Sequence, residues 1–300
     1  GFLLAAVIGI PLGLFMGWFR LCDRVIRPLF EVIRPIPSLA WIPIVLLFLG
    51  IGVEARAVII FTGCFVATVL NTYTGIRSTN QTLVNVAKTC GAGNLKIFWT
   101  VGVPSAMPMI FAGLKTSMGS AWGTIVAAEM LASSNGLGYM IQMGRSFGDV
   151  SLIMAGIIVI GILGFVSSGI VSLVAGFAYG PAAAVIVSVL GFLPHLFTNP
   201  WGTLMAVLVA LALSVPAALI YRRNKTRKGA VIGIIVGAIA ALAVAIVGNV
   251  IVTPFYAHMT TAQVVALIVP ALLPFNALKF TIHGVVTFLI YKPISNLLNR

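Results

Sequence analysis

Residues 150–221 contain no Asp, Glu, Lys or Arg, an uncharged run of 72 residues. A water-soluble domain needs charged side chains on its surface, so a soluble fold does not leave such a length uncharged. A helix that crosses bilayer hydrocarbon takes about 20 apolar residues, so this run has room for about three such helices. The whole chain agrees, because 60% of its residues are hydrophobic and only 8% are charged. The sequence therefore predicts a polytopic membrane protein.

The apolar segments predict an all-α transmembrane bundle of about nine spans. Helices are expected because the edges of an open sheet leave backbone groups without partners in lipid. The predicted spans cover residues 2–19, 37–53, 57–76, 107–131, 150–175, 176–197, 201–221, 229–254 and 264–291.

The positions of Lys and Arg predict the orientation of the bundle. If the first span runs inwards and the rest alternate, fourteen basic residues fall in inner loops and two, Arg56 and Arg145, in outer loops. Cytoplasmic loops of membrane proteins are enriched in Lys and Arg, so this bias places the C-terminus in the cytoplasm. It also accounts for the net charge of +13 without a nucleic-acid partner, with anionic membrane lipid as a further attraction. The inner residues are Arg20, Arg24, Arg27, Arg34, Arg77, Lys88, Lys96, Arg222, Arg223, Lys225, Arg227, Lys228, Lys292 and Arg300.

The chain shows no pattern that predicts an enzyme, a cofactor or a metal site. It has no phosphate-binding loop and no constellation that would activate a nucleophile. His195, His258 and His283 have no Cys or carboxylate at metal-ligand spacing. The acidic residues stop at Asp149, and this shift in composition predicts two units, residues 1–175 and 176–300.

The hydrophilic stretch 77–106 carries the most informative spacing in the first unit. Asn85, Val86 and Ala87 are followed after three residues by Gly91, then after nine residues by Val101, and Pro104 closes the pattern. This spacing resembles the cytoplasmic loop through which type I ABC importer permeases contact their ATPase subunit. The resemblance implies that these six residues form an ATPase-coupling loop, with a sharp turn at Gly91. An ordinary amphipathic inner loop is the alternative.

Three neighbouring segments, PIPSLAWIP at 35–43, FLGIG at 48–52 and AWGTIVAAEM at 121–130, extend the resemblance. They are similar to the nitrate/sulfonate/taurine branch of the same family. The resemblance implies cytoplasmic ATP-binding subunits and an extracytoplasmic substrate-binding protein as partners, and an N-terminal part of the family that is missing before Gly1. Glu129 is an ionisable side chain at membrane depth, so it either lines the translocation path or is a carboxylate at the outer interface or paired to Lys115.

Residues 176–300 resemble the riboflavin-specific S component of energy-coupling-factor transporters, without its first helices. The most specific part is PFNALK at 274–279, where Asn276 and Lys279 share one helix face. The resemblance implies that Asn249, Asn276 and Lys279 are flavin contacts. The alternative is that Lys279 extends to the interface and the two Asn side chains bridge helices.

The sequence therefore predicts a multi-pass protein of a prokaryotic cell membrane. Its expected role is the permease subunit of an ATP-driven import system, fused to a riboflavin-transporter-like bundle. The substrate would be riboflavin or a small anion of the sulfonate/nitrate kind. Two alternatives remain: a riboflavin-binding protein whose first half is a scaffold, and a chimera that transports nothing.

Overall fold

The computed structural model describes residues 1–192, 200–257 and 260–298. Within these ranges the chain is helical and contains no β-strand, which confirms the predicted all-α class. The chain divides into two compact units, residues 1–164 and 165–300. The predicted division after residue 175 instead falls inside a continuous helix, α9 (Val150–Tyr179), whose residues belong to both units.

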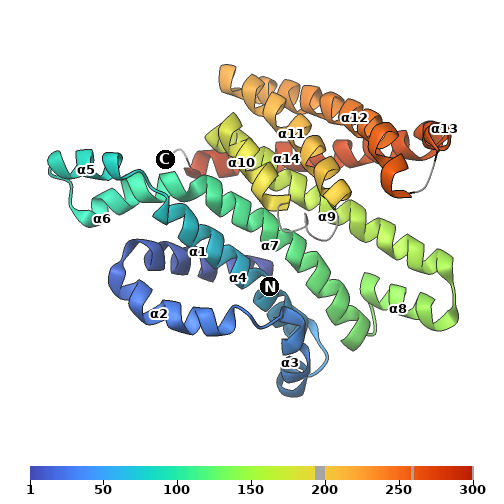
Figure 1. The fold of residues 1–300 in the computed structure, drawn as a ribbon, viewed down its shortest axis with the longest axis horizontal. Helices are drawn as coiled ribbons and strands as arrows, with labels where there is room; N and C mark the ends of the chain where they lie inside the picture. Colours follow the sequence, from blue (N-terminus) through green and yellow to red (C-terminus); the bar gives the residue numbers. More distant parts are fainter. Residues whose placement is uncertain (193–199, 258–259, 299–300) are drawn as a thin grey trace. The chain divides into compact units, whose positions relative to one another are not determined.

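The first unit begins with an apolar helix and ends in the first half of α9 (Figure 1). Its elements are α1 (Phe2–Trp18), α2 (Arg20–Ile33), the 3-10 turn η1 (Ser38–Trp41), α3 (Ile42–Leu49), α4 (Val53–Arg77), α5 (Gln81–Thr89), α6 (Asn94–Ile97), the π-helical turn η2 (Phe98–Gly102), α7 (Val103–Ala132) and α8 (Leu137–Phe147).

Helix α4 is the centre of this unit and packs along both α1 and α7. Glycine allows the close approach of α1. A Cβ atom added to Gly13 would lie 2.7 Å from the backbone oxygen of Val69 and 2.8 Å from Cβ of Thr72. Real Cβ atoms do not come this close, so the two helices meet backbone to backbone here. In lipid such contacts provide the van der Waals packing that holds helices together.

The second unit is formed by the rest of α9 and by α10 (Pro181–Phe192), α11 (Pro200–Arg223), α12 (Arg227–Ala257), α13 (Thr261–Ala266), the π-helical turn η4 (Ile268–Leu272) and α14 (Leu273–Leu298). Its core joins α9, α11 and α12 through small and aliphatic side chains, among them Leu173, Leu213, Ala217 and Ala241.

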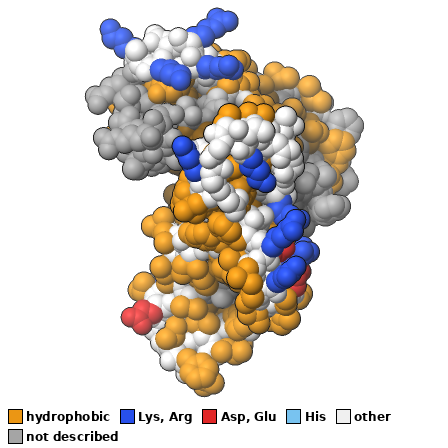
Figure 2. Space-filling view, turned by 90° about the vertical axis from the view of Figure 1, so that its left-hand side faces the viewer, with side chains coloured by type: hydrophobic (Ala, Val, Ile, Leu, Met, Phe, Trp, Pro, Cys, Tyr) orange, Lys and Arg blue, Asp and Glu red, His pale blue; other side chains and the backbone are white. Residues whose placement is uncertain are grey.

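Five described helices are long and apolar enough to cross a membrane. They are Val53–Arg77, Asn94–Leu131, Val150–Tyr179, Pro200–Arg223 and Lys228–Pro254. Two bent helix pairs would raise the number to seven if each is one span. Hydrophobic side chains cover much of the face shown in Figure 2, as expected of a surface that meets lipid. The predicted count of nine spans is not confirmed, and the cytoplasmic C-terminus stays a prediction.

The predicted span 37–53 is wrong as a continuous helix. The α-helix there is Ile42–Leu49, preceded by the 3-10 turn η1, and α4 begins at Val53. Pro35 and Pro37 lie at the 83° bend between α2 and η1, because proline cannot donate to the helix ladder and disfavours helical geometry in the residue before it. The helix ends at Gly50, whose φ of 67° suits glycine alone among common residues.

Two other predicted spans also differ from the structure. Residues 264–291 are bent by 54° at η4, which contains Pro270. The predicted boundary between 175 and 176 is displaced to Gly180, where φ is 87°. Helix α10 then has 12 residues, which span about 18 Å and do not cross hydrocarbon alone. Residues 193–197 of that predicted span lie outside the described residues.

Helix α10 decides how many crossings separate Ser134, before α8, from Thr226, after α11. Three crossings place the two residues on opposite sides of the membrane, whereas two place them on the same side. We predict opposite sides, because Arg222 and Arg223 lie next to Thr226 and basic loops stay in the cytoplasm.

The measurement uses the single-cysteine variants Ser134→Cys and Thr226→Cys in a chain whose Cys22, Cys64 and Cys90 are replaced. A membrane-impermeant maleimide added to intact cells should label only the first variant. Labelling of both would show that α10 does not complete a crossing.

Candidate functional site

The predicted coupling loop is a short helix, a glycine turn and a second short helix. Helix α5 begins at the side chain of Asn80, which accepts a hydrogen bond of 2.8 Å from the backbone of Thr82. It ends at Thr89, and the chain turns at Gly91, where φ is 79°. The backbone N–H groups of Gly91 and Ala92 donate to the carbonyls of Lys88 and Ala87, at 2.9 and 3.0 Å. This paired bonding is the Schellman arrangement, which requires a left-handed residue and favours glycine. The bend predicted at Gly91 is present.

The outer surface of this loop combines apolar and basic side chains. Val86 is 55% exposed and Trp99 is 58% exposed, and the side chains of Leu83 and Leu95 are also exposed. Lys88 and Lys96 lie among them, and the loop contains no acidic residue. Of the other predicted loop residues, Asn85 and Pro104 are exposed, whereas Ala87 and Val101 are partly buried. Exposed apolar side chains of this density are typical of a protein-binding surface.

Aromatic packing anchors the loop to the end of α1. Phe98 is 1% exposed, and its ring centroid lies 5.7 Å from the rings of Phe15 and Trp18 and 5.6 Å from that of Phe19. Nε1 of Trp18 also donates to the side-chain oxygen of Asn94 at 3.2 Å. Sequence reasoning missed these contacts. The only signal in the sequence was a group of aromatic residues at Phe15–Phe19 and another at Phe98 and Trp99. No spacing rule pairs residues that lie so far apart in the sequence.

Helix α7 continues from this anchor into a polar seam with α4. The hydroxyl of Ser117 lies 2.7 Å from that of Thr68 and 3.0 Å from the carbonyl oxygen of Cys64. The side chains of all three are buried, as is that of Lys115 on the same helix. Hydrogen bonds between membrane helices contribute about 0.6–2 kcal/mol each. The seam therefore fixes α7 against α4 at depth, and the sequence did not predict it.

Glu129 lies near the end of α7 and holds the turn into α8. Its Oε2 accepts a hydrogen bond of 2.8 Å from the backbone of Gly138, and its Oε1 lies 3.9 Å from the guanidinium of Arg56. The same guanidinium donates to Asn135 Oδ1 at 3.3 Å, across the α7–α8 turn. Pairing with Lys115, one of the predicted alternatives, is wrong: fourteen residues of one helix separate the two by about 21 Å. Glu129 is thus a clamp between α4, α7 and α8.

The three predicted flavin contacts lie in the second unit. The side-chain N–H₂ of Asn249 donates to the carbonyl of Ala245, and that of Asn276 to the carbonyl of Leu272, both at 2.7 Å. Each amide thus bonds its own helix. Lys279 is buried, and its Nζ lies 3.8 Å from the ring centroid of Phe165. Aromatic faces attract cations, so this contact offsets part of the cost of burying Lys279.

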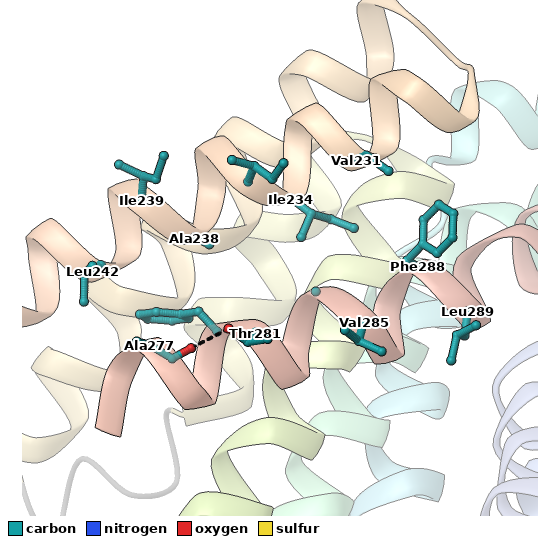
Figure 3. Close-up of a pocket in the computed structure, with 13 residues that line it drawn as sticks. Val231, Ile234, Ala238, Ile239, Leu242, Ala277, Thr281, Val285, Phe288 and Leu289 are labelled. Atoms are coloured by element: carbon teal, nitrogen blue, oxygen red, sulfur yellow. Dashed lines mark hydrogen bonds between the residues drawn. The ribbon is translucent and has the colours of Figure 1, made fainter. Parts of the chain in front are cut away.

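A cavity of about 500 Å³ lies between α12 and α14 (Figure 3). Apolar side chains from both helices line it, among them Ile234, Ile239, Val285 and Phe288. None of the three predicted flavin contacts lines it. A flavin needs polar partners for the edge of its ring, and this wall does not supply them. Among the described residues no group of three or more His, Cys, Asp or Glu side chains could hold a metal ion. His195 and His258 lie outside the described residues.

Comparison with known proteins finds a family and several relatives that resemble this chain. Residues 9–228 match the model of the family described as binding-protein-dependent transport system inner membrane component. A probable ABC transporter permease protein of Brucella melitensis is 40% identical over 164 residues, 55% of this chain and 67% of that protein. The taurine transport system permease protein of Escherichia coli is 35% identical over 161 residues, 54% of this chain and 58% of that protein.

The nitrate import permease protein of Leptolyngbya laminosa is 35% identical over 175 residues, 58% of this chain and 63% of that protein. The chain therefore spans about two thirds, or less, of the length of these relatives. The family match runs past residue 175, where the riboflavin-like unit was predicted to begin. These comparisons do not support the riboflavin resemblance.

The clamp at Glu129 predicts a loss of stability in Glu129→Ala. The substitution leaves the N–H of Gly138 and the charge of Arg56 without their carboxylate, and should lower the free energy of unfolding by about 1–3 kcal/mol. Thermal unfolding of the purified protein in detergent measures it. Glu54→Ala is the matched control, because it removes the same charge from an exposed position at the start of α4. Equal, small shifts of the unfolding temperature in the two variants would contradict the structural role of Glu129.

Proposed function

Since the chain belongs to the family of inner membrane components of binding-protein-dependent transport systems, we propose that it is the permease subunit of an ATP-driven importer. In this proposal ATP hydrolysis belongs to a cytoplasmic ATP-binding subunit, as membership of the family implies. The chain is helical throughout its described part and carries five helices that can cross a membrane, as this role requires.

The observation that carries the proposal is the exposed loop α5–Gly91–α6, which is anchored to α1 through Phe98 and Asn94. Its apolar residues Leu83, Val86 and Leu95 face outward, whereas Ile97 and Phe98 are buried against the helices behind them. A docked ATPase subunit would cover the three outward-facing residues, and its movement would be transmitted to the two buried ones. We assign the ATPase-coupling role to Asn85, Val86, Ala87, Gly91, Val101 and Pro104.

Movement of the loop has a direct route into the membrane. Residues 94–131 form one helical run through α6, η2 and α7, without a loop to absorb displacement. Ser117 then joins α7 to α4 through the hydrogen bonds of the polar seam. A shift at the cytoplasmic end would therefore reposition both helices together. In this mechanism rigid helices transmit the movement of the loop into the membrane, and such movements drive alternating access.

The names of the relatives suggest the cargo. One belongs to a taurine transport system and another imports nitrate, so we propose a small anion of the sulfonate or nitrate class for this chain. An extracytoplasmic binding protein would deliver it. A role for Glu129 in the translocation path stays a proposal, and the clamp geometry gives it no support.

Riboflavin transport is the weaker proposal for residues 176–300. It rests on the sequence resemblance at Asn249, Asn276 and Lys279 alone. Both amides already donate to backbone carbonyls four residues earlier. The cavity between α12 and α14 is lined by apolar side chains apart from Thr281, whose hydroxyl donates to the carbonyl of Ala277. We therefore assign no riboflavin site to this chain.

The glycine turn provides the test of coupling. Gly91→Val forces a β-branched side chain into a left-handed conformation, at a cost of about 1–2 kcal/mol or more, and should distort the end of α5. We expect association with the ATPase subunit of the same transport system to fall at least about tenfold. Pull-down from membranes with the tagged subunit measures it.

Gly93→Val is the matched control. Gly93 lies two residues away, an added Cβ meets nothing within 4 Å at either position, and the φ of Gly93 is −70°, which valine accepts. The two variants therefore differ in backbone conformation and not in bulk. Undiminished association of Gly91→Val would contradict the coupling role of the turn.

A further inference from the structure

A polar cavity of about 530 Å³ lies where α1, α2, α4 and α5 meet in the first unit. Four basic side chains and one acidic side chain line it, so it carries a clear excess of positive charge. These are Arg20, Arg24, Arg77, Lys88 and Asp23. Lys88 comes from α5 of the coupling loop, whereas the other charged residues of the cavity lie on α2 and α4. The polar seam between α4 and α7 does not reach this cavity.

The single carboxylate is already neutralised by other residues. Asp23 Oδ2 lies 3.5 Å from the guanidinium of Arg77 and 4.0 Å from that of Arg27. All five acidic residues of the chain lie in its described part, and none of the ion pairs found there involves Arg20, Arg24 or Lys88. Within the described residues, three cations therefore line one cavity without an ion pair to a carboxylate.

The start of α2 adds to this positive field. The helix runs for 14 residues from Arg20, and no side chain caps its first turn. The first N–H groups of a helix have no partner inside it, and the helix dipole favours an anion at this end. The cavity thus joins three cationic side chains to a helix N-terminus, which is the chemistry of a phosphate site.

The opposite side of α2 indicates where that phosphate comes from. Leu21, Val25, Leu29 and Val32 recur at helical spacing and are exposed, with 74% of Leu21 and 70% of Val32 accessible. Phe30, on a third side, is buried in the core of the unit. The charged side is too costly to enter hydrocarbon and the apolar side too large to leave in water. A helix of this kind lies in the membrane interface.

We propose that this cavity binds the phosphate of an anionic phospholipid from the cytoplasmic leaflet, with α2 as the interfacial helix beside it. The exposed apolar side of α2 lies among the acyl chains, and Arg20, Arg24 and Lys88 face the headgroup. Basic pockets between helices on the cytoplasmic side are known to suit such headgroups. In Figure 2, Lys and Arg side chains gather beside acidic ones at one edge of a mainly hydrophobic face, as this placement requires.

The test measures lipid binding to the purified full chain in detergent by native mass spectrometry. Phosphatidylglycerol and phosphatidylcholine with identical acyl chains are compared. We expect phosphatidylglycerol to bind at least about tenfold more tightly. Arg24→Gln and Lys88→Gln should each weaken its binding several-fold, and both side chains are exposed, so the fold should survive.

Arg34→Gln is the matched control, because Arg34 follows the same helix, pairs with Glu31 and does not line the cavity. It should change the affinity less than twofold. Equal binding of the two lipids, or an equal loss in Arg34→Gln, would overturn the site. Displacement of the lipid by millimolar inorganic phosphate would show that the cavity takes free phosphate and would overturn the lipid as its occupant.

Discussion

The burial of Phe98 against the aromatic end of α1 is the contact on which the first unit depends. Complete burial of a phenylalanine contributes about 1.5–3 kcal/mol, and each aromatic pair about 0.5–1.5 kcal/mol more. Phe98 contacts three aromatic rings of the segment Phe15–Phe19. These few kcal/mol hold an exposed loop onto the end of α1.

The loop is held by contacts at two levels. Locally, Gly91 lets two backbone N–H groups satisfy the last carbonyls of α5. Beyond the loop, α7 passes from the anchor to the seam at Ser117 as one helix. The clamp of Glu129 on Arg56 and Gly138 fixes the other end of that helix. Together these contacts attach α7 to its neighbours at both ends and at Ser117.

Sequence patterns predicted the features that depend only on residues close together in the chain. The helical class, the membrane setting and the turn at Gly91 follow from hydropathy and from the left-handed conformation that glycine accepts. Contacts between distant residues were not predictable from spacing, and Phe98 with Trp18 and Glu129 with Arg56 are the examples. The span at 37–53 failed because hydropathy counts apolar residues, whereas the backbone conformation at Gly50 ends the helix inside it.

The native Cys90 allows the most direct test of the central claim, that an ATPase subunit docks on this loop. Its side chain is exposed at the end of α5, beside Gly91. In a variant whose Cys22 and Cys64 are replaced, the rate of maleimide labelling of Cys90 is measured with and without the ATPase subunit. The account predicts at least about a tenfold slower rate in the complex, because docking covers this surface. An unchanged rate in a demonstrably assembled complex would contradict it.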